Sequence, residues 1–238
     1  VFRQHEQGTR HNTEFTLLEW YARGEDHHAQ MDFVERLIRA VAALNPDDVQ
    51  LADKSFDRLT YDEAFRRFVG TSVLALTGPQ LRDLAAQHHV SAPPGLDEHD
   101  RDGWLNLLLA EKVEPELGKE HPQFLIDYPA SQAALARIRR DDCPVAERFE
   151  LYLHGIEICN GYHEESNADE LTSRFERQNK IREQEGQAPL PLPELFLAAT
   201  RDGYPASSGV ALGLERLLMW RMKKATLPEV VAFSYDRA

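Results

Sequence analysis

The chain has 238 residues, of which 42% are hydrophobic and 28% are charged, an ordinary balance for a globular protein long enough to bury a substantial core. No apolar run reaches the length of a membrane span and the N-terminal residues lack the apolar segment of a secretory signal, so neither a membrane protein nor a secreted one is predicted. The net charge of −13 argues against nucleic-acid binding by bulk electrostatics, and two cysteines, Cys143 and Cys159, provide neither a disulfide framework nor a zinc site, which indicates a reducing cytoplasm.

The N-terminal part of the chain changes from a strand-like to a helical pattern. Its first 21 residues alternate loosely and are rich in Phe, Thr, Trp and Tyr, which favours two strands around the polar loop Glu6 to Asn12. From Asp26 onward the apolar period is helical. One face carries Met31, Val34, Leu37, Ile38 and Val41.

The middle third of the chain has the start signals of several helices. Thr60 and Glu63 have the spacing of a capping box, Pro79 opens a second helical stretch, and a third surrounds Trp104. We therefore predict a helical insertion from 60 to 120 within one domain of residues 1–238.

The last part of the chain alternates between strand and helix patterns. Strand character is present at 123–128 and again at 147–164, where Gly155 marks a bend between two strands. A charged helix is expected from Asn167 to about Gly186, and 209–222 has a glycine-rich entry followed by an amphipathic helix. The elements together predict an α+β fold in which an antiparallel sheet is flanked by helices.

Three widely separated segments carry the most specific patterns. Residues 2–21 contain FRQHE and RHNTEFTLLEWY, residues 209–217 read GVALGLERL, and residues 148–164 contain RFE and GIEICNGYHE. The first two resemble motifs 2 and 3 of class II aminoacyl-tRNA synthetases, and the third resembles the glutamate pair, Asn and Glu of the lysyl type. This resemblance implies an ATP-dependent enzyme that activates a lysine-type amino acid.

Within that group the chain is more similar to the elongation factor P (R)-β-lysine ligases, the truncated paralogues of lysyl-tRNA synthetase. The segments PASQAALA at 129–136 and VAFSYDRA at 231–238 resemble the ligase form, and Cys159 stands where lysyl-tRNA synthetases usually have Gly. The resemblance implies activation of (R)-β-lysine or lysine as an adenylate, transfer to a lysine side chain of elongation factor P, and a homodimer at full length. Motif 1 and the strand that precedes motif 2 have no match in the chain.

Two arginines are the predicted catalytic residues. Adenylate formation joins a carboxylate to a phosphate while negative charge builds at phosphorus, so fixed cations with a planar fork are required. The resemblance implies that Arg3 holds the α-phosphate and substrate carboxylate and that Arg216 holds the γ-phosphate end. The alternative is two surface arginines in ordinary ion pairs.

The remaining ATP contacts are also implied by the resemblance. They are Glu6, Arg10, His11, Asn12 and Gly213 together with the arginines. His11 is equally compatible with packing or solvation. Relatives often carry an acidic residue at position 5, where this chain has His5, so Glu6 is the substitute that we expect at adenine.

Glu150 and Glu157 are the predicted metal ligands, because Mg²⁺ bridging ATP phosphates prefers hard carboxylate oxygens. Seven residues apart, they have opposite strand parity, so a bend such as one at Gly155 has to bring them to one site. The alternative is a pair of exposed carboxylates on a hairpin.

The amino-acid pocket is predicted on strand faces. Asn160, Tyr162 and Glu164 share parity and offer an amide, an aromatic wall and a carboxylate that fits an ammonium group. The resemblance adds Glu19 and Tyr21 from the motif 2 strand, and Cys159 as a residue that shapes the pocket around a β-amino group. The alternative is a set of polar residues on a wet sheet face.

Two further functions stay open. The first alternative is a catalytic fragment of a lysyl-tRNA synthetase, in which case tRNA is the acceptor. A non-catalytic binding or regulatory protein with the synthetase fold is the third possibility.

Overall fold

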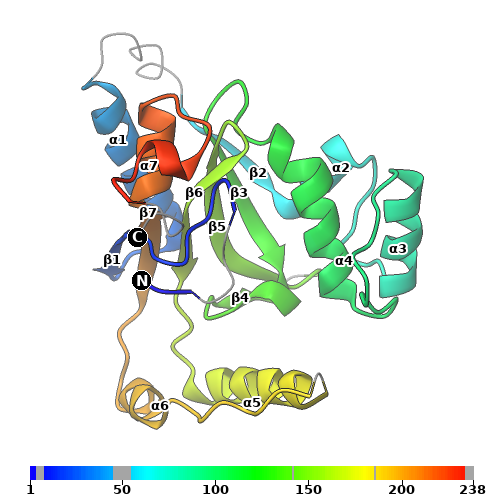
Figure 1. Cartoon of the computed structure of the whole chain (residues 1–238). Helices are drawn as coiled ribbons and strands as arrows, with labels where there is room; N and C mark the ends of the chain where they lie inside the picture. The colour runs from blue at the N-terminus through cyan, green and yellow to red at the C-terminus, as the bar shows by residue number, and fades with distance from the viewer. Residues whose placement is uncertain (4–7, 45–54, 141, 185, 234–238) are drawn as a thin grey trace.

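The computed structural model describes residues 1–3, 8–44, 55–140, 142–184 and 186–233. Its centre is a seven-stranded sheet with the order β1-β7-β6-β5-β3-β2, and the short strand β4 pairs with β5 on the edge away from β3 (Figure 1). The strands are β1 (Leu17–Arg23), β2 (Asp57–Thr60), β3 (Gln123–Pro129), β4 (Ile138–Arg139), β5 (Val145–Leu153), β6 (Ile156–His163) and β7 (Ser207–Gly213).

The α+β expectation is confirmed, with one correction to the sheet. The strand β2 pairs with β3 in parallel, whereas the other pairs are antiparallel. The sheet is therefore mixed. A second refinement concerns the predicted glycine-rich entry at 209–213, which is part of β7 and lies between β1 and β6 in the sheet.

The helices are α1 (His27–Ala42), α2 (Tyr61–Phe68), α3 (Gly78–Gln87), α4 (Arg101–Leu108), α5 (Ala168–Gln184), α6 (Glu194–Arg201) and α7 (Leu214–Arg221). A π-helical turn (Leu109–Val113) continues α4, and short 3₁₀ turns occur at Glu114–Glu116, Ala130–Gln132 and Leu227–Glu229. No helix in the described ranges is both long and apolar enough to cross a bilayer.

The helices α1 and α7 cover one face of the sheet (Figure 1). The helix α1 starts where predicted, because the Asp26 carboxylate accepts a hydrogen bond from the backbone N–H of Ala29 at 2.9 Å. Its apolar stripe, which includes the fully buried Met31, Val34 and Ile38, packs against strands β3, β5, β6 and β7.

The helices α2, α3 and α4 cover the opposite face. The predicted capping box is present, since the Thr60 hydroxyl accepts from the Glu63 N–H while the Glu63 carboxylate accepts from the Thr60 N–H. These helices share one core with the sheet, in which Tyr128 of β3 and Tyr152 of β5 lie among the helical apolar side chains. The segment 60–120 is thus largely helical, and its status as an insertion stays a prediction.

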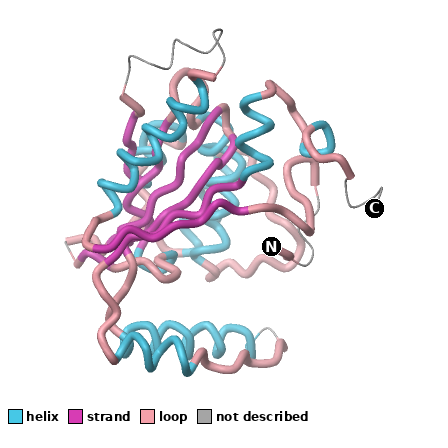
Figure 2. The backbone as a smooth tube through the Cα atoms, turned by 90° about the vertical axis from the view of Figure 1, so that its left-hand side faces the viewer, coloured by secondary structure: helices cyan, strands magenta, loops and turns pink. Residues whose placement is uncertain are grey.

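The helices α5 and α6 pack together at some distance from the sheet, at the end of two extended connections (Figure 2). The predicted start of α5 is confirmed, because the Asn167 side chain accepts from the N–H groups of Asp169 and Glu170. Arg174 fixes the helix to the body through the carbonyl of Ala136 at 2.7 Å. The helix α6 was not predicted.

The N-terminal hairpin is less regular than predicted. Val1 and Phe15 exchange backbone hydrogen bonds, and isolated bridges join Phe2 to Glu14 and Gly8 to His11, but the first regular strand begins only at Leu17. The predicted ATP ligand Glu6 lies outside the described residues.

Candidate active site

The β5–β6 hairpin determines which side chains share a face. His154 and Gly155 form its two-residue turn with φ values of 51° and 69°, and Tyr152 lies opposite Glu157. Cross-strand neighbours point to one face, and Glu150, two residues before Tyr152, shares it. The turn therefore places Glu150 and Glu157 on the same face, as the bend predicted at Gly155 requires.

A register shift then reverses the remaining alternation of β6. One extra residue, Ile158, stands between Glu157 and Cys159, so that Cys159 pairs with Leu151 and Asn160 pairs with Glu150. Asn160 and Tyr162 consequently lie on the face of the two glutamates. We call this the site face.

Cys159 lies on the other face, and its predicted role in shaping the amino-acid pocket stays a prediction. Although the residue borders a cleft, it is 2% exposed and belongs to the core beneath α1 and α7. Burial raises the pKa of its thiol. The single-residue shift in β6 is the physical reason, because it turns every following side chain over.

A solvent-open cleft with an empty volume of about 630 Å³ lies beside β6, β7 and the N-terminal hairpin. From the hairpin it is lined by Arg3, Arg10, His11 and Asn12. From the distant half of the chain it is lined by Glu157, Gly213 and Arg216. Every described residue of the predicted ATP set except Glu150 thus borders one cavity.

Arg216 joins these segments. Its Nη1 donates to the Glu157 carboxylate at 2.9 Å and to the Glu157 carbonyl at 3.0 Å, while its Nη2 lies 2.8 Å from His11 Nε2. Because a guanidinium only donates, His11 Nε2 is the acceptor of this contact. The arginine at the start of α7 is therefore held in place by β6 on one side and by the hairpin on the other.

Two more cations border the cleft. The Arg3 guanidinium lies 5.2 Å from the centre of the Phe15 ring, and Arg10 Nη1 donates to the carbonyl of Gly155 at 3.2 Å. Phe15 itself lines the cleft and offers an aromatic wall. In a chain with a net charge of −13, three guanidinium groups around one cavity form a site suited to an anion.

Glu150 is enclosed by donors that the sequence prediction did not assign. The hydroxyls of Tyr128 and Tyr152 donate to its Oε2 at 2.5 and 2.7 Å, and Arg148 Nη2 donates to its Oε1 at 2.5 Å. Arg148 and Glu150 are two residues apart on β5, so strand alternation alone predicts that their side chains share a face. Tyr128 lies on β3, and no local sequence pattern predicts its contact with Glu150. A carboxylate has about four acceptor positions, so Glu150 retains capacity for one further ligand.

A second cavity gathers three carboxylates, those of Glu114, Glu150 and Glu157. Burial first and the Glu150 charge second raise the pKa of Glu157, while Arg216 acts in the opposite direction. The same two causes raise the pKa of Glu114, which the sequence prediction missed because it lies in the helical segment. Mutual repulsion between buried carboxylates is relieved by a hard divalent cation, so this donor set fits Mg²⁺.

The residues predicted to bind the amino-acid substrate lie in rows of cross-strand neighbours. Pairing across four strands places Glu19, Ala211, Asn160 and Glu150 in one row, and Tyr21, Gly209, Tyr162 and Arg148 in the next. Because neighbours in a row point to one face, the side chains predicted on β1 and β6 lie on the site face.

Glu164 lies just beyond this sheet, against Gly209. A Cβ at Gly209 would lie 2.6 Å from Glu164 Oε1 and 2.7 Å from the Tyr21 ring, so only glycine lets these two groups lie against β7. Burial raises the pKa of Glu164 to about 7, opposed by a hydrogen bond from the Gly209 N–H, and no cation from the described residues contributes. A partly buried carboxylate with no counter-ion in the described part of the chain is suited to a ligand ammonium.

The comparisons with known proteins agree with these features. The family of class II tRNA synthetases (D, K and N) matches residues 1–237. The elongation factor P–(R)-β-lysine ligase of Edwardsiella ictaluri (strain 93-146) is 44% identical over 237 residues, which cover 100% of this chain and 70% of that protein. The chain therefore belongs to the class II tRNA synthetase family that comprises the D, K and N types.

Proposed function

We propose that this chain activates (R)-β-lysine as an adenylate with ATP and transfers the β-lysyl group to a lysine side chain of elongation factor P. The observation that carries the proposal is the convergence of Arg3, His11, Glu157 and Arg216 on one cleft, at the end of the sheet face that presents Glu164. The name of the 44% identical relative supports the identity of both the amino acid and the acceptor.

ATP binds in the cleft. Its phosphates meet the guanidinium groups of Arg3 and Arg216, and the base lies near Phe15 and the hairpin. The substrate carboxylate oxygen attacks the α-phosphorus, a phosphorus–oxygen bond to the β-phosphate breaks, and pyrophosphate leaves. Positive groups held in place before the reaction stabilise the charge that develops at phosphorus.

Magnesium belongs to this proposal as the ion held by Glu157 and Glu150, beside Glu114. When bound, Mg²⁺ neutralises phosphate charge and orients the phosphate chain. In the protein, Arg216 keeps the Glu157 carboxylate toward the cleft, and the two tyrosines with Arg148 hold Glu150 in one orientation.

The amino-acid side chain lies along the site face with its ammonium at Glu164. Tyr21 and Tyr162 form apolar walls, and Asn160 and Glu19 offer polar contacts to the second amino group. A neutral side chain leaves the partly buried Glu164 charge unpaired, which is the physical basis of selection for lysine-type substrates.

The second step is acyl transfer. The neutral amine of an acceptor lysine attacks the carbonyl carbon of the adenylate, the bond to the phosphate oxygen breaks, and AMP leaves. The family name makes a lysyl-tRNA synthetase activity the alternative, in which a tRNA hydroxyl is the nucleophile. Homodimer formation at full length and a cytoplasmic location stay predictions.

The test is a transfer assay with radiolabelled (R)-β-lysine or α-lysine, ATP and Mg²⁺, in which either elongation factor P or tRNA is the acceptor. We expect label on elongation factor P, more from (R)-β-lysine than from α-lysine, and loss of that label with Arg216→Ala. Label on tRNA alone supports the synthetase alternative. No label on either acceptor, with ATP still bound, indicates a non-catalytic protein and refutes the proposal.

A further inference from the structure

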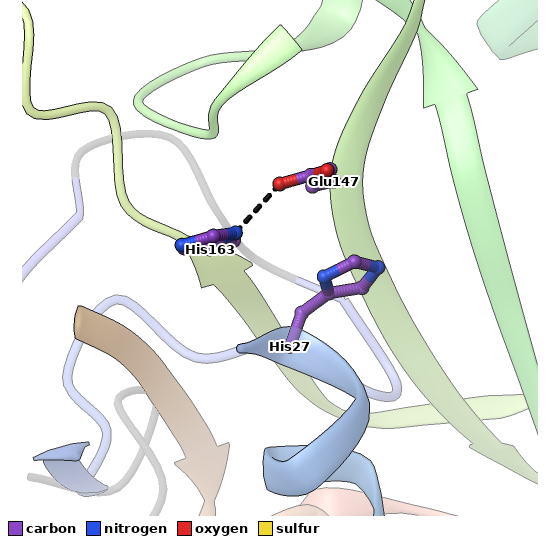
Figure 3. Close-up of side chains that lie close together, drawn as sticks. All are labelled: His27, Glu147 and His163. Atoms are coloured by element: carbon purple, nitrogen blue, oxygen red, sulfur yellow. Dashed lines mark hydrogen bonds and ion pairs between the residues drawn. The ribbon is translucent and has the colours of Figure 1, made fainter. Parts of the chain in front are cut away.

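Three potential metal ligands meet on the sheet face opposite the nucleotide cleft. His27 is the first residue of α1, Glu147 lies on β5, and His163 is the last residue of β6 (Figure 3). One ligand atom from each lies within 4.8 Å of the others. Glu147 directly precedes the site-face residue Arg148, and His163 directly follows the site-face residue Tyr162. Because successive side chains of a strand point to opposite faces, this cluster lies on the face of the sheet that α1 covers.

His27 is the unusual member of this cluster. It is 3% exposed, and neither of its ring nitrogens has a hydrogen-bond partner among the described residues. Buried polar groups are ordinarily paired, so an imidazole whose two nitrogens have no partner among the described residues is available to bind a ligand.

His163 and Glu147 supply the other half of the cluster. His163 Nδ1 lies 2.6 Å from Glu147 Oε2, and both side chains are mostly buried, with 14% and 13% of their surface exposed. Arg137 also lies close to this carboxylate, with Nε 3.9 Å from Oε2. A carboxylate that contacts one imidazole and faces a second is a common arrangement around a transition metal.

We propose that His27, Glu147 and His163 bind a divalent transition-metal ion of the Zn²⁺ class, with water at the fourth position. Two imidazoles and one carboxylate suit Zn²⁺ better than Mg²⁺, which prefers oxygen ligands alone. Zinc–ligand bonds of about 2.0–2.2 Å bring ligand atoms to roughly 3.3 Å from one another. The ion therefore draws His27 toward the pair and replaces the His163–Glu147 hydrogen bond with two metal bonds.

The consequence is structural. The ion ties the first turn of α1 to the ends of β5 and β6, and β6 carries Asn160 and Tyr162 on its other face. The site is separate from the magnesium ligands, since Glu150 and Glu157 point to the site face. It is assigned from these three side chains alone and does not depend on the proposed reaction.

The experiment uses the full chain freed of metal by chelation, in a Cys143→Ser background that removes the exposed thiol. Co²⁺ is titrated while its visible absorption is recorded, Zn²⁺ is then added as competitor, and the melting temperature is measured with and without Zn²⁺. The variants are His27→Ala and Glu147→Gln. The matched control is His28→Ala, which removes the adjacent, exposed imidazole from the same helix.

We expect one Co²⁺ per chain with the absorption of a four- or five-coordinate ion, displacement by Zn²⁺, and a higher melting temperature with Zn²⁺. His28→Ala keeps this behaviour. His27→Ala and Glu147→Gln lower the affinity by on the order of tenfold or more, because even indirect changes around metal sites cost about 10–100-fold. If His27→Ala does not fold, Glu147→Gln decides alone, since the amide still accepts a hydrogen bond from His163.

Two results overturn the proposal. One is the absence of saturable uptake by the parent chain. The other is uptake with equal affinity in the parent chain and the folded variants, which assigns the ion to different residues.

Discussion

Arg216 Nη1 donates to both the carboxylate and the backbone carbonyl of Glu157, at 2.9 and 3.0 Å. The two residues are far apart in the chain, yet this double contact fixes the first turn of α7 against β6 at the edge of the cleft. The same arginine contacts His11 with its other terminal nitrogen, so one side chain connects three segments of the predicted nucleotide site.

Arg216→Lys tests whether this planar fork is required. Lysine keeps the charge but loses the two-point geometry, so we expect lysine-dependent ATP–pyrophosphate exchange to fall by on the order of 10²-fold. The matched control is Arg221→Lys on the same helix, which lies outside the cleft and retains the parent rate. Equal rates for both variants would show that the position of the charge, rather than its geometry, is sufficient.

Glu164→Gln tests the ammonium site. The pKa of Glu164 is about 7, whereas the substrate ammonium stays charged until far higher pH, so the KM for the amino acid falls as pH rises from about 6 to about 8. The variant removes this dependence and raises KM by on the order of 10²-fold. Steady-state kinetics across this range provide the measurement, and a variant with the parent pH profile would refute the assignment.

Glu164 also predicts a pH dependence of stability. Its pKa in the folded protein, about 7, lies above the ordinary value of 4.5, so between these values the folded chain holds a proton that the unfolded chain has released. Its contribution is therefore complete below pH about 4.5 and is lost as pH rises through about 7. We expect the free energy of unfolding in urea to fall less steeply over this window in Glu164→Gln than in the parent chain.

Gly209→Ala tests the close approach of Glu164 and Tyr21 to β7. The new methyl group overlaps both, so we expect KM for the amino acid to rise by about tenfold or more while the fold is retained. Gly213→Ala on the same strand is the steric control, because its Cβ lies 3.7 Å from the nearest atom. That variant keeps the KM for the amino acid, and an equal rise in both variants would point to a general effect on the strand.

Cys159→Ala tests whether the Cys159 side chain contributes to core packing or to the choice between α-lysine and (R)-β-lysine. The buried side chain contacts the core beneath α1, so truncation lowers the free energy of unfolding by about 1 kcal/mol, and Cys159→Gly by roughly 2 kcal/mol. The preference between α-lysine and (R)-β-lysine in pyrophosphate exchange stays the same. A changed preference would restore the contact that the sequence prediction assigned to this side chain.

Local signals in the sequence were sufficient for much of the fold. The capping residues Asp26 and Thr60 predicted the starts of α1 and α2, and Gly155 predicted the turn between β5 and β6. These features depend on residues close together in the chain, which is why pattern and propensity identify them.

Features that depend on tertiary packing were not predicted. The extra residue Ile158 reverses the alternation of β6 and moves Cys159 into the core, and nothing in the local pattern marks it. The parallel pairing of β2, the tyrosine hydroxyls at Glu150, and the meeting of His27 with His163 all join distant segments. In each case the contact becomes visible only when the sheet order is known.

The central claim is that the cleft around Arg216 and Glu157 forms an adenylate from a substrate whose ammonium lies at Glu164. The most direct measurement is ATP–pyrophosphate exchange by the parent chain with (R)-β-lysine, α-lysine or norleucine, which matches the lysine side chain without its ammonium. The account predicts exchange with the lysines, strongest with (R)-β-lysine, and only background exchange with norleucine. Equal exchange with norleucine, or no exchange with any of the three, would contradict it.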